Sequence, residues 1–413
     1  MAKNGKQLRN EREQRVMDAI ALKPTDRVPI ISGIGYFPAK YTGILCSDAY
    51  YNYDAWYNAY KKTLTDFTPD MVFPQAFTPG KALEILALKT QKWPGHGVDP
   101  HQGHQAIEIE NMKAEEYDIY MKDPSDYLFR TFLARTSPEL EGMALLPKLS
   151  DMSGGLGALG LAASMGNPKV AHAFKTLLAA GKEFRKWAPK MKRFNKMISD
   201  LGYPTYFQGA AMPPFDVLSH SMRGMTGTMM DMFRQPKKIE EMTEFILKQT
   251  LERPAPIPSE NGYSRIFMTN TRGDDTFMSM EQFKKFYWPT FYKLVMGLIE
   301  RGRTPCIFFE GNFTSRLEYL LEFPRGKILA RLDTTDIFRA KDVLKDHVCI
   351  EGNVPSSLLQ VGSKEDVIEH CKKLIDYVGK GGGFIISPRS STDEVKPENL
   401  MAMIEFTKEY GRY

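Results

Sequence analysis

The sequence has few cysteines, no long apolar run and only a small excess of charge. Its 413 residues include four cysteines, and no two of them form a C-x-x-C pair. This spacing gives no sign of a disulfide framework or a zinc ribbon. No apolar stretch approaches the roughly 20 residues that cross a bilayer, and the charged start MAKNGKQLRNEREQ has no signal-peptide core. We therefore expect a cytoplasmic protein that spans no membrane.

The charge balance argues against a nucleic-acid partner. Lysine and arginine total 55 against 50 acids, a net charge of +5, which is too small to indicate nucleic-acid binding by itself. Hydrophobic residues make up 42% and charged residues 25% of the chain, both ordinary for globular proteins. Aromatic residues are plentiful, at 12%.

Short runs rich in Val, Ile and Phe recur along the chain. They cover 28–34, 70–77, 203–209, 265–269, 304–309, 327–332, 347–350 and 383–387. None alternates apolar with polar residues, which is typical of parallel strands covered on both faces. Apolar stripes of helical spacing follow, most clearly at 280–301, 364–378 and 397–410. The pattern predicts one (β/α)8 TIM barrel over residues 1–413, with a doubly wound open sheet as the alternative.

Residues from about 127 to 199 interrupt this alternation. The stretch is mostly helical in character, and we interpret it as an inserted lid. Between Lys175 and Met197 it carries eight basic residues and one acid, Glu183. A basic helical face is usually a solvated surface, but it also suits an acidic partner protein. Pro189 predicts a break or kink in this helix.

Polar residues at predicted strand ends are the candidates for a site, because barrel enzymes place their catalytic groups there. Glu310 is the strongest, since the run CIFF ends directly on it. A buried carboxylate without a partner costs free energy, so Glu310 needs a metal, a catalytic task or a cation such as Arg316. Asp333 follows the next strand, and acids meeting at one rim favour a cation site, an acid/base pair or a basic substrate. Arg389, after the last strand, is their expected counter-ion.

Five further residues are candidates for the site. Tyr36 and Phe37 follow the first strand and would line an aryl pocket, unless they pack in the core. Gln208 ends the third predicted strand, and His220 lies in a loop beyond it. Asp275 follows the fourth strand, where it could instead order a turn.

Four stretches together resemble the uroporphyrinogen decarboxylase superfamily. They are RVMDAIALKPTDRVPI, GDDTFMSMEQFKKFYWPTF, IEGNVPSSLLQVGSKEDV and GGGFIISPRSSTDEVKPENL. The resemblance implies a (β/α)8 barrel with its active site at the mouth formed by the carboxyl ends of the strands. It also implies a homodimer.

The resemblance can be narrowed to one branch. Decarboxylases carry arginines after the first strand to hold porphyrin carboxylates, and here that place reads SGIGYFPAKYTG, without arginine. Relatives that methylate coenzyme M bind zinc through His-x-Cys and a later Cys. Phe308, Glu310 and the stretch 387–389 stand at those places here, so a thiolate zinc site is not supported. What remains is similar to corrinoid-dependent methyltransferases that demethylate methoxylated aromatics.

The expected function is therefore methyl transfer from a small methylated donor, a methoxylated aromatic, to a cobalamin-carrying corrinoid protein. Glu310 would protonate the leaving oxygen, or would bind a metal such as zinc together with Asp333. Asp275 and Arg389 would adjust charge in the pocket. The expected donor contacts are Tyr36, Phe37, Gln208 and His220. A cofactor-independent decarboxylase is the alternative, and a barrel that only binds a ligand is a third possibility.

Overall fold

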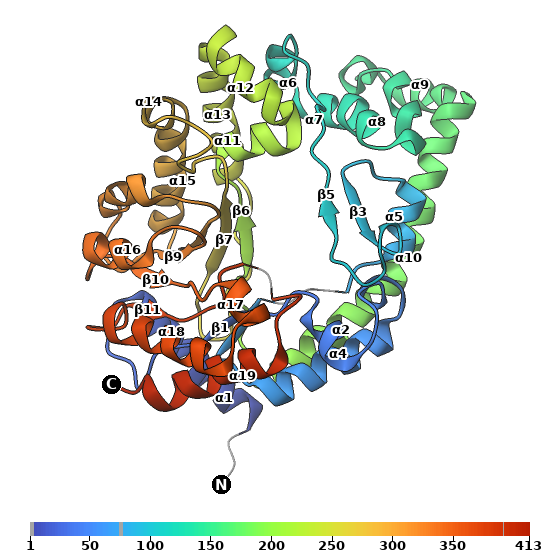
Figure 1. Cartoon of the computed structure of the whole chain (residues 1–413). Helices are drawn as coiled ribbons and strands as arrows, with labels where there is room; N and C mark the ends of the chain where they lie inside the picture. Colours follow the sequence, from blue (N-terminus) through green and yellow to red (C-terminus); the bar gives the residue numbers. More distant parts are fainter. Residues whose placement is uncertain (1–3, 74–76, 391) are drawn as a thin grey trace.

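Eight parallel strands close into a barrel (Figure 1). The computed structural model describes residues 4–73, 77–390 and 392–413. The strands are β1 (Ile31–Gly33), β2 (Met71–Phe73), β6 (Gly209–Ala211), β7 (Arg265–Asn270), β8 (Thr304–Phe309), β9 (Leu329–Leu332), β10 (Cys349–Glu351) and β11 (Phe384–Ile385). Six of them pair in the order β11-β10-β9-β8-β7-β6, and β1 pairs with β2. Parallel bridges from Ile30 to Ile386 and from Val72 to Thr205 join the two sheets. The predicted barrel is confirmed, and an open sheet is excluded.

Seven strands lie inside the predicted runs or within one residue of them, and the third does not. The prediction placed it at 203–209, whereas β6 begins at Gly209. Tyr203 and Tyr206 made residues 203–209 look like a buried strand. In the structure this stretch forms a single described bridge to β2, at Thr205, and the regular strand pairing starts later. In the second run, residues 74–76 lie outside the described residues.

Helices surround the barrel and cover its outer face. Those of the barrel are α1 (Gly5–Ile20), α2 (Phe37–Thr42), α3 (Asp48–Tyr51), α4 (Tyr53–Phe67), α5 (Gly80–Leu86), α11 (Pro214–Asp216), α12 (Gly224–Arg234), α13 (Pro236–Leu251), α14 (Met280–Gln282), α15 (Trp288–Glu300), α16 (Ile337–Leu344), α17 (Ser356–Val361), α18 (Lys364–Tyr377) and α19 (Pro397–Tyr410). Shorter turns are the π-helices η4 (Val217–Arg223) and η5 (Phe283–Tyr287) and the 3-10 helix η6 (Thr314–Glu322). The three predicted apolar stripes correspond to α14 through α15, α18 and α19.

Between β2 and β6 the chain leaves the barrel. It forms a small sheet of β3 (Gln91–Pro94), β4 (Gly97–Val98) and β5 (Gln105–Ala106), followed by α6 (Tyr117–Lys122), α7 (Pro124–Asp126), η1 (Tyr127–Phe132), α8 (Leu133–Thr136), η2 (Pro138–Leu145), η3 (Leu149–Met152), α9 (Gly157–Ser164) and α10 (Pro168–Asp200). The long helix α10 runs along the flank beside α5 (Figure 1). That this segment acts as a lid stays a prediction.

Of the break or kink predicted at Pro189, the break is wrong, since α10 continues through it from Pro168 to Asp200. The kink stays a prediction. A proline removes one backbone hydrogen bond and crowds the preceding turn. Packing on both sides of it offsets this cost, because Ala180 and Phe194 are buried on the inner face.

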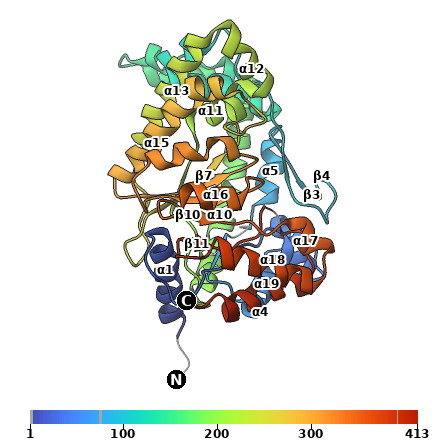
Figure 2. The same ribbon diagram turned by 60° about the vertical axis from the view of Figure 1, so that its left-hand side comes forward.

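Helix α1 closes the amino end of the barrel. Its residues Val16, Met17 and Ile20 form one buried cluster with inward residues of the strands, namely Ile31, Met71, Cys306, Leu329, Cys349 and Ile385. Glu13 of α1 forms a buried ion pair with Arg265, the first residue of β7, at 2.7 Å. Figures 1 and 2 both show α1 beside the carboxyl terminus. The opposite mouth, at the carboxyl ends of the strands, is therefore the open end.

Two expectations from composition can be compared with the structure. All four cysteines are buried and none is in a disulfide. Within the described ranges, no helix is long and apolar enough to cross a membrane.

Candidate functional site

Glu310 lies at the mouth, between the ends of β7 and β9. Its backbone N–H donates to the carbonyl of Asn270 at 3.0 Å, and the next residue, Gly311, turns the chain with a φ of +101°. The Glu310 side chain is exposed rather than buried, so the expected cost of a sealed carboxylate does not arise. Partial desolvation and the charge of Asp333 raise its pKa.

Asp333 is held beside Glu310 by the loops after three successive strands. Its carboxylate accepts from the Gly311 N–H at 3.2 Å. Its carbonyl accepts from the Asn353 side chain at 2.9 Å, and the same amide reaches the carbonyl of Thr335. Asn353 belongs to the Gly-Asn sequence after β10, so this motif fixes the rim on which the two carboxylates stand.

A buried ion pair forms the floor below these acids. Arg331 Nε lies 3.5 Å from an oxygen of Glu351, whose other oxygen accepts from the Tyr206 hydroxyl at 2.8 Å. The guanidinium of Arg331 also stacks over the Phe308 ring, 4.8 Å from its centroid. Desolvation raises the pKa of Glu351, and Arg331 opposes the rise. Through space, Arg331 likewise opposes the rise in the pKa of Glu310.

His220 of η4 lies at the same mouth, where it contacts the two residues that follow β7, Thr271 and Arg272. Its Nε2 pairs with the Thr271 hydroxyl, and its Nδ1 is 3.3 Å from the guanidinium of Arg272. Desolvation, and then the charge of Arg272, lower the pKa of His220, which favours the neutral ring at neutral pH. Arg272 also opposes the raised pKa of Glu310, so its charge acts on both titratable groups.

Asp216 orders this corner from below. Its carboxylate is fully buried and accepts from the Arg272 N–H at 2.9 Å and from the Tyr287 hydroxyl at 2.6 Å. Desolvation raises the pKa of Asp216 to about 6. Tyr287 contacts Asn270 as well, at 2.6 Å, so the loop after β7 is fixed at several points.

Residues 107–113, which we call the strap, cross from the small sheet to the barrel and close this side of the mouth. Glu108 of the strap pairs with Arg272 and lies 3.6 Å from His220 Nδ1. The N–H groups of Asn111 and Met112 both donate to the carbonyl of Met222, at 2.8 Å. The strap therefore delivers a carboxylate to the site from a segment more than 100 residues away in sequence.

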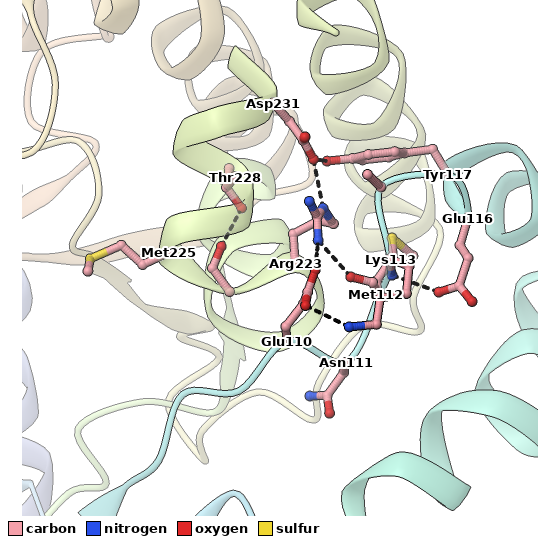
Figure 3. Close-up of polar contacts among 12 residues, drawn as sticks. Glu110, Asn111, Met112, Lys113, Glu116, Tyr117, Arg223, Met225, Thr228 and Asp231 are labelled. Carbon is pink, nitrogen blue, oxygen red and sulfur yellow. Dashed lines mark hydrogen bonds and ion pairs between the residues drawn. The ribbon is translucent and has the colours of Figure 1, made fainter. Parts of the chain in front are cut away.

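Arg223 anchors the strap (Figure 3). Its guanidinium pairs with Asp231 at 2.7 Å, donates to the carbonyl of Met112 at 2.9 Å and reaches Glu110. The Tyr117 hydroxyl donates to the same Asp231 at 2.8 Å. The side chains of Arg223 and Asp231 are only 5% and 3% exposed, so this pair is a buried, well-connected anchor.

Two of the other predicted residues lie near strand ends in separate contact groups. The Tyr36 hydroxyl contacts Tyr50 at 2.8 Å and His104 Nδ1 at 3.0 Å. Asp275 accepts from the Ser315 N–H and hydroxyl, at 3.1 and 2.8 Å, and so holds the first turn of η6.

Neither expected cation pairs with Glu310 in the described part of the chain. Arg316 lies 3.4 Å from Asp275 and donates to two main-chain carbonyls. The charge of Arg389 acts on His370 of α18, whose pKa it lowers after desolvation. The cations that act on Glu310 are Arg272 and Arg331, which the sequence did not single out.

Gln208 and Phe37 are not brought to this group. Gln208 bonds the backbone of Arg265, the first residue of β7, and so lies at the amino end of that strand. Phe37 is fully buried and packs against Tyr41 and Phe67. The structure therefore gathers Glu310, Asp333 and His220 at the mouth. The roles predicted for these three residues stay predictions, as do those of the five others, Tyr36, Phe37, Gln208, Asp275 and Arg389.

Three comparisons relate the chain to known proteins. The model of the family "Uroporphyrinogen decarboxylase (URO-D)" matches residues 156–410. A uroporphyrinogen decarboxylase from Methylococcus capsulatus is 32% identical over 119 residues, which are 28% of this chain and only 33% of that protein. A methyltransferase from Methanosarcina mazei has the same fold, with a TM-score of 0.58 and 13% identity over 97% of this chain and 98% of that one.

Proposed function

The chain belongs to the uroporphyrinogen decarboxylase (URO-D) family, and from this premise we propose that it is a methyltransferase. The donor is a small methylated compound, in the first place a methoxylated aromatic. The acceptor is a corrinoid carried by a separate protein. Similarity in fold to the methyltransferase from Methanosarcina mazei is compatible with this proposal, and the chemistry of the mouth supports it.

The raised pKa of Glu310 carries the proposal. Cleavage of an aryl methyl ether leaves a phenolate, and a proton delivered to that oxygen lowers the barrier. A carboxyl group that stays protonated to a higher pH than usual is suited to this task. Desolvation and the charge of Asp333 favour the protonated form of Glu310. The charges of Arg272 and Arg331 reduce the rise in its pKa.

The proposed step moves one methyl group and one proton. The bond between the methyl carbon and the ether oxygen breaks, and Glu310 gives its proton to that oxygen, so that a phenol leaves. The corrinoid, when its carrier is bound, supplies the nucleophile that takes the methyl group. Glu310 regains a proton from water, since its side chain is exposed.

The remaining groups of the mouth position the donor. The neutral His220 ring is held by Thr271 and faces the guanidinium of Arg272. The strap and Asp216 fix these groups from two sides, so a donor entering the mouth meets a preorganised polar wall.

A zinc ion does not fit the residues at the mouth. Glu310 and Asp333 offer two carboxylates, whereas a catalytic zinc site uses three protein ligands. Across 4–73, 77–390 and 392–413, no group of three or more His, Cys, Asp or Glu side chains could hold a metal ion. The proposed step therefore uses Glu310 as a proton donor and contains no metal-assisted part.

Methyl transfer to cob(I)alamin tests the proposal. The protein is mixed with cob(I)alamin, free or on a corrinoid protein, and with a set of methoxylated aromatics, and the methylcobalamin spectrum is followed. We expect transfer from at least one aryl methyl ether. Glu310→Gln should lose at least about 100-fold in rate, the usual contribution of a general acid, while the matched exposed variant Glu318→Gln should keep full rate. Carbon dioxide release without any corrinoid would instead favour the decarboxylase alternative.

A further inference from the structure

The net positive charge of the protein comes from helix α10. It contains nine lysines and arginines and two acids, a charge of +7 in 33 residues, whereas the chain carries +5 in all 413. The other 380 residues together are therefore slightly negative, at −2. An uneven distribution of this size points to one charged surface rather than to a generally basic protein.

The cations form a stripe on the outer face of α10. Residues about 3.6 apart share a face of a helix, and the buried residues Ala173, Ala180 and Phe194 occupy the inner face. The opposite face carries Lys175, Lys182, Arg185, Lys192 and Lys196, all exposed.

Four of the five cations in the stripe are not neutralised by the described residues. Lys196 pairs with Asp200 of the same helix at 2.7 Å. Lys175, Lys182, Arg185 and Lys192 make no ion pair with the described residues. Leu178 lies among them on the same face with 68% of its surface exposed. An exposed apolar side chain beside unpaired cations offers a partner protein both a hydrophobic and a charged contact.

The middle of α10 lies level with the barrel mouth. The Trp187 indole of α10 donates to the carbonyl of Phe77, which follows β2 on the side of its carboxyl end. The Tyr53 hydroxyl donates to the carbonyl of Lys190 at 2.8 Å. A protein bound to the outer face of α10 therefore stands on the flank of the barrel, level with the mouth.

We propose that the outer face of α10 docks an acidic surface of the corrinoid protein and so presents the corrinoid to the mouth. This inference rests on the proposed function. Charge complementarity selects the partner, since lysines and arginines attract carboxylates and speed association. Leu178 adds an apolar contact within the interface.

Charge reversal tests this surface. The variant combines Lys182→Glu, Arg185→Glu and Lys192→Glu. The control combines Lys284→Glu, Lys327→Glu and Lys380→Glu, which make the same charge change at exposed positions of the barrel. Methyl transfer is measured with two acceptors, a cob(I)alamin-loaded corrinoid protein and free cob(I)alamin, at low and high salt.

We expect the α10 variant to raise the KM for the corrinoid protein by at least about tenfold and to leave transfer to free cob(I)alamin unchanged. The control should change neither. For the unaltered enzyme, the same KM should rise with salt, because exposed charges are screened. Leu178→Ala, which keeps helix propensity, should raise the KM several-fold at both salt concentrations.

Three results would overturn the docking surface. One is an unchanged KM for the corrinoid protein in the α10 variant, and another is an equal loss with both acceptors. The third is tight binding of poly(U) RNA or phosphatidylglycerol vesicles that the α10 variant abolishes, with no effect on the corrinoid protein. Absence of transfer to either acceptor by the unaltered enzyme would refute the proposed function, and direct binding of the loaded corrinoid protein to both variants would still decide the inference.

Discussion

The buried pair that anchors the strap gives the most quantitative prediction. Arg223→Met keeps the length of the side chain but leaves the carboxylate of Asp231 without its cation. That carboxylate is 3% exposed, and among the described contacts it would keep the Tyr117 hydroxyl at 2.8 Å. Removing one partner of a buried ion pair costs about 3–5 kcal/mol, mostly because the remaining charge is desolvated.

The change in Tm that corresponds to this loss of stability depends on the size of the protein. Unfolding entropy is about 2.1 cal/mol/K per residue, which for 413 residues is roughly 0.9 kcal/mol/K. Each kcal/mol therefore lowers the Tm by about 1 °C, and Arg223→Met should lower it by about 3–6 °C in scanning calorimetry at neutral pH.

Two comparison variants distinguish the cost of leaving a buried charge unpaired from the cost of losing an exposed ion pair. Lys113→Met breaks the exposed pair with Glu110 in the same strap, which should cost less than about 1 kcal/mol. Asp231→Asn, added to Arg223→Met, removes the stranded charge and should restore much of the lost stability. The reasoning is refuted if Arg223→Met costs no more than Lys113→Met, or if Asp231→Asn lowers the Tm further.

Two further predictions concern titration. Asp333→Asn removes the negative charge that raises the pKa of Glu310, so the loss of methyl transfer at high pH should begin at a lower pH than in the unaltered enzyme; an unmoved pH profile would contradict the role of Glu310 as proton donor. Asp216 has a pKa of about 6 in the folded protein against 3.8 when unperturbed, so the folded state binds more protons between these values. Its contribution to stability is full below about pH 4 and is lost as pH rises through 6, by up to about 3 kcal/mol. Asp216→Asn should be free of this decline in urea unfolding from pH 4 to 7, and a decline equal to that of the unaltered protein would disprove the assignment.

The barrel could be predicted from sequence because buried parallel strands are nearly continuous apolar runs. CIFF before Glu310 is such a run, and the strand β8 ends where the run ends. The same rule misplaced the third strand, because Tyr203 and Tyr206 are buried without belonging to a regular strand. Tyr203 packs in the outer core, while Tyr206 reaches into the barrel and donates to Glu351.

The site was predictable only where it follows strand ends. Glu310 and Asp333 come directly after apolar runs, so their position in sequence reveals them. Arg331 lies inside such a run and looks like a stray charge, although an arginine within LARL is itself a signal of a buried partner. Arg272 and Glu108 are 164 residues apart, and no local pattern connects them.

The closure of the amino end has a consequence for synthesis of the chain. Helix α1 is made before the barrel strands, yet its apolar face packs against Leu329, Cys349 and Ile385, which are synthesised much later. The N–H of Val28 also donates to the carbonyl of Gly411 at 2.8 Å. While the ribosome is still working, α1 therefore exposes Val16, Met17 and Ile20 without a partner, which makes the nascent chain a candidate for chaperone binding until its final strand emerges.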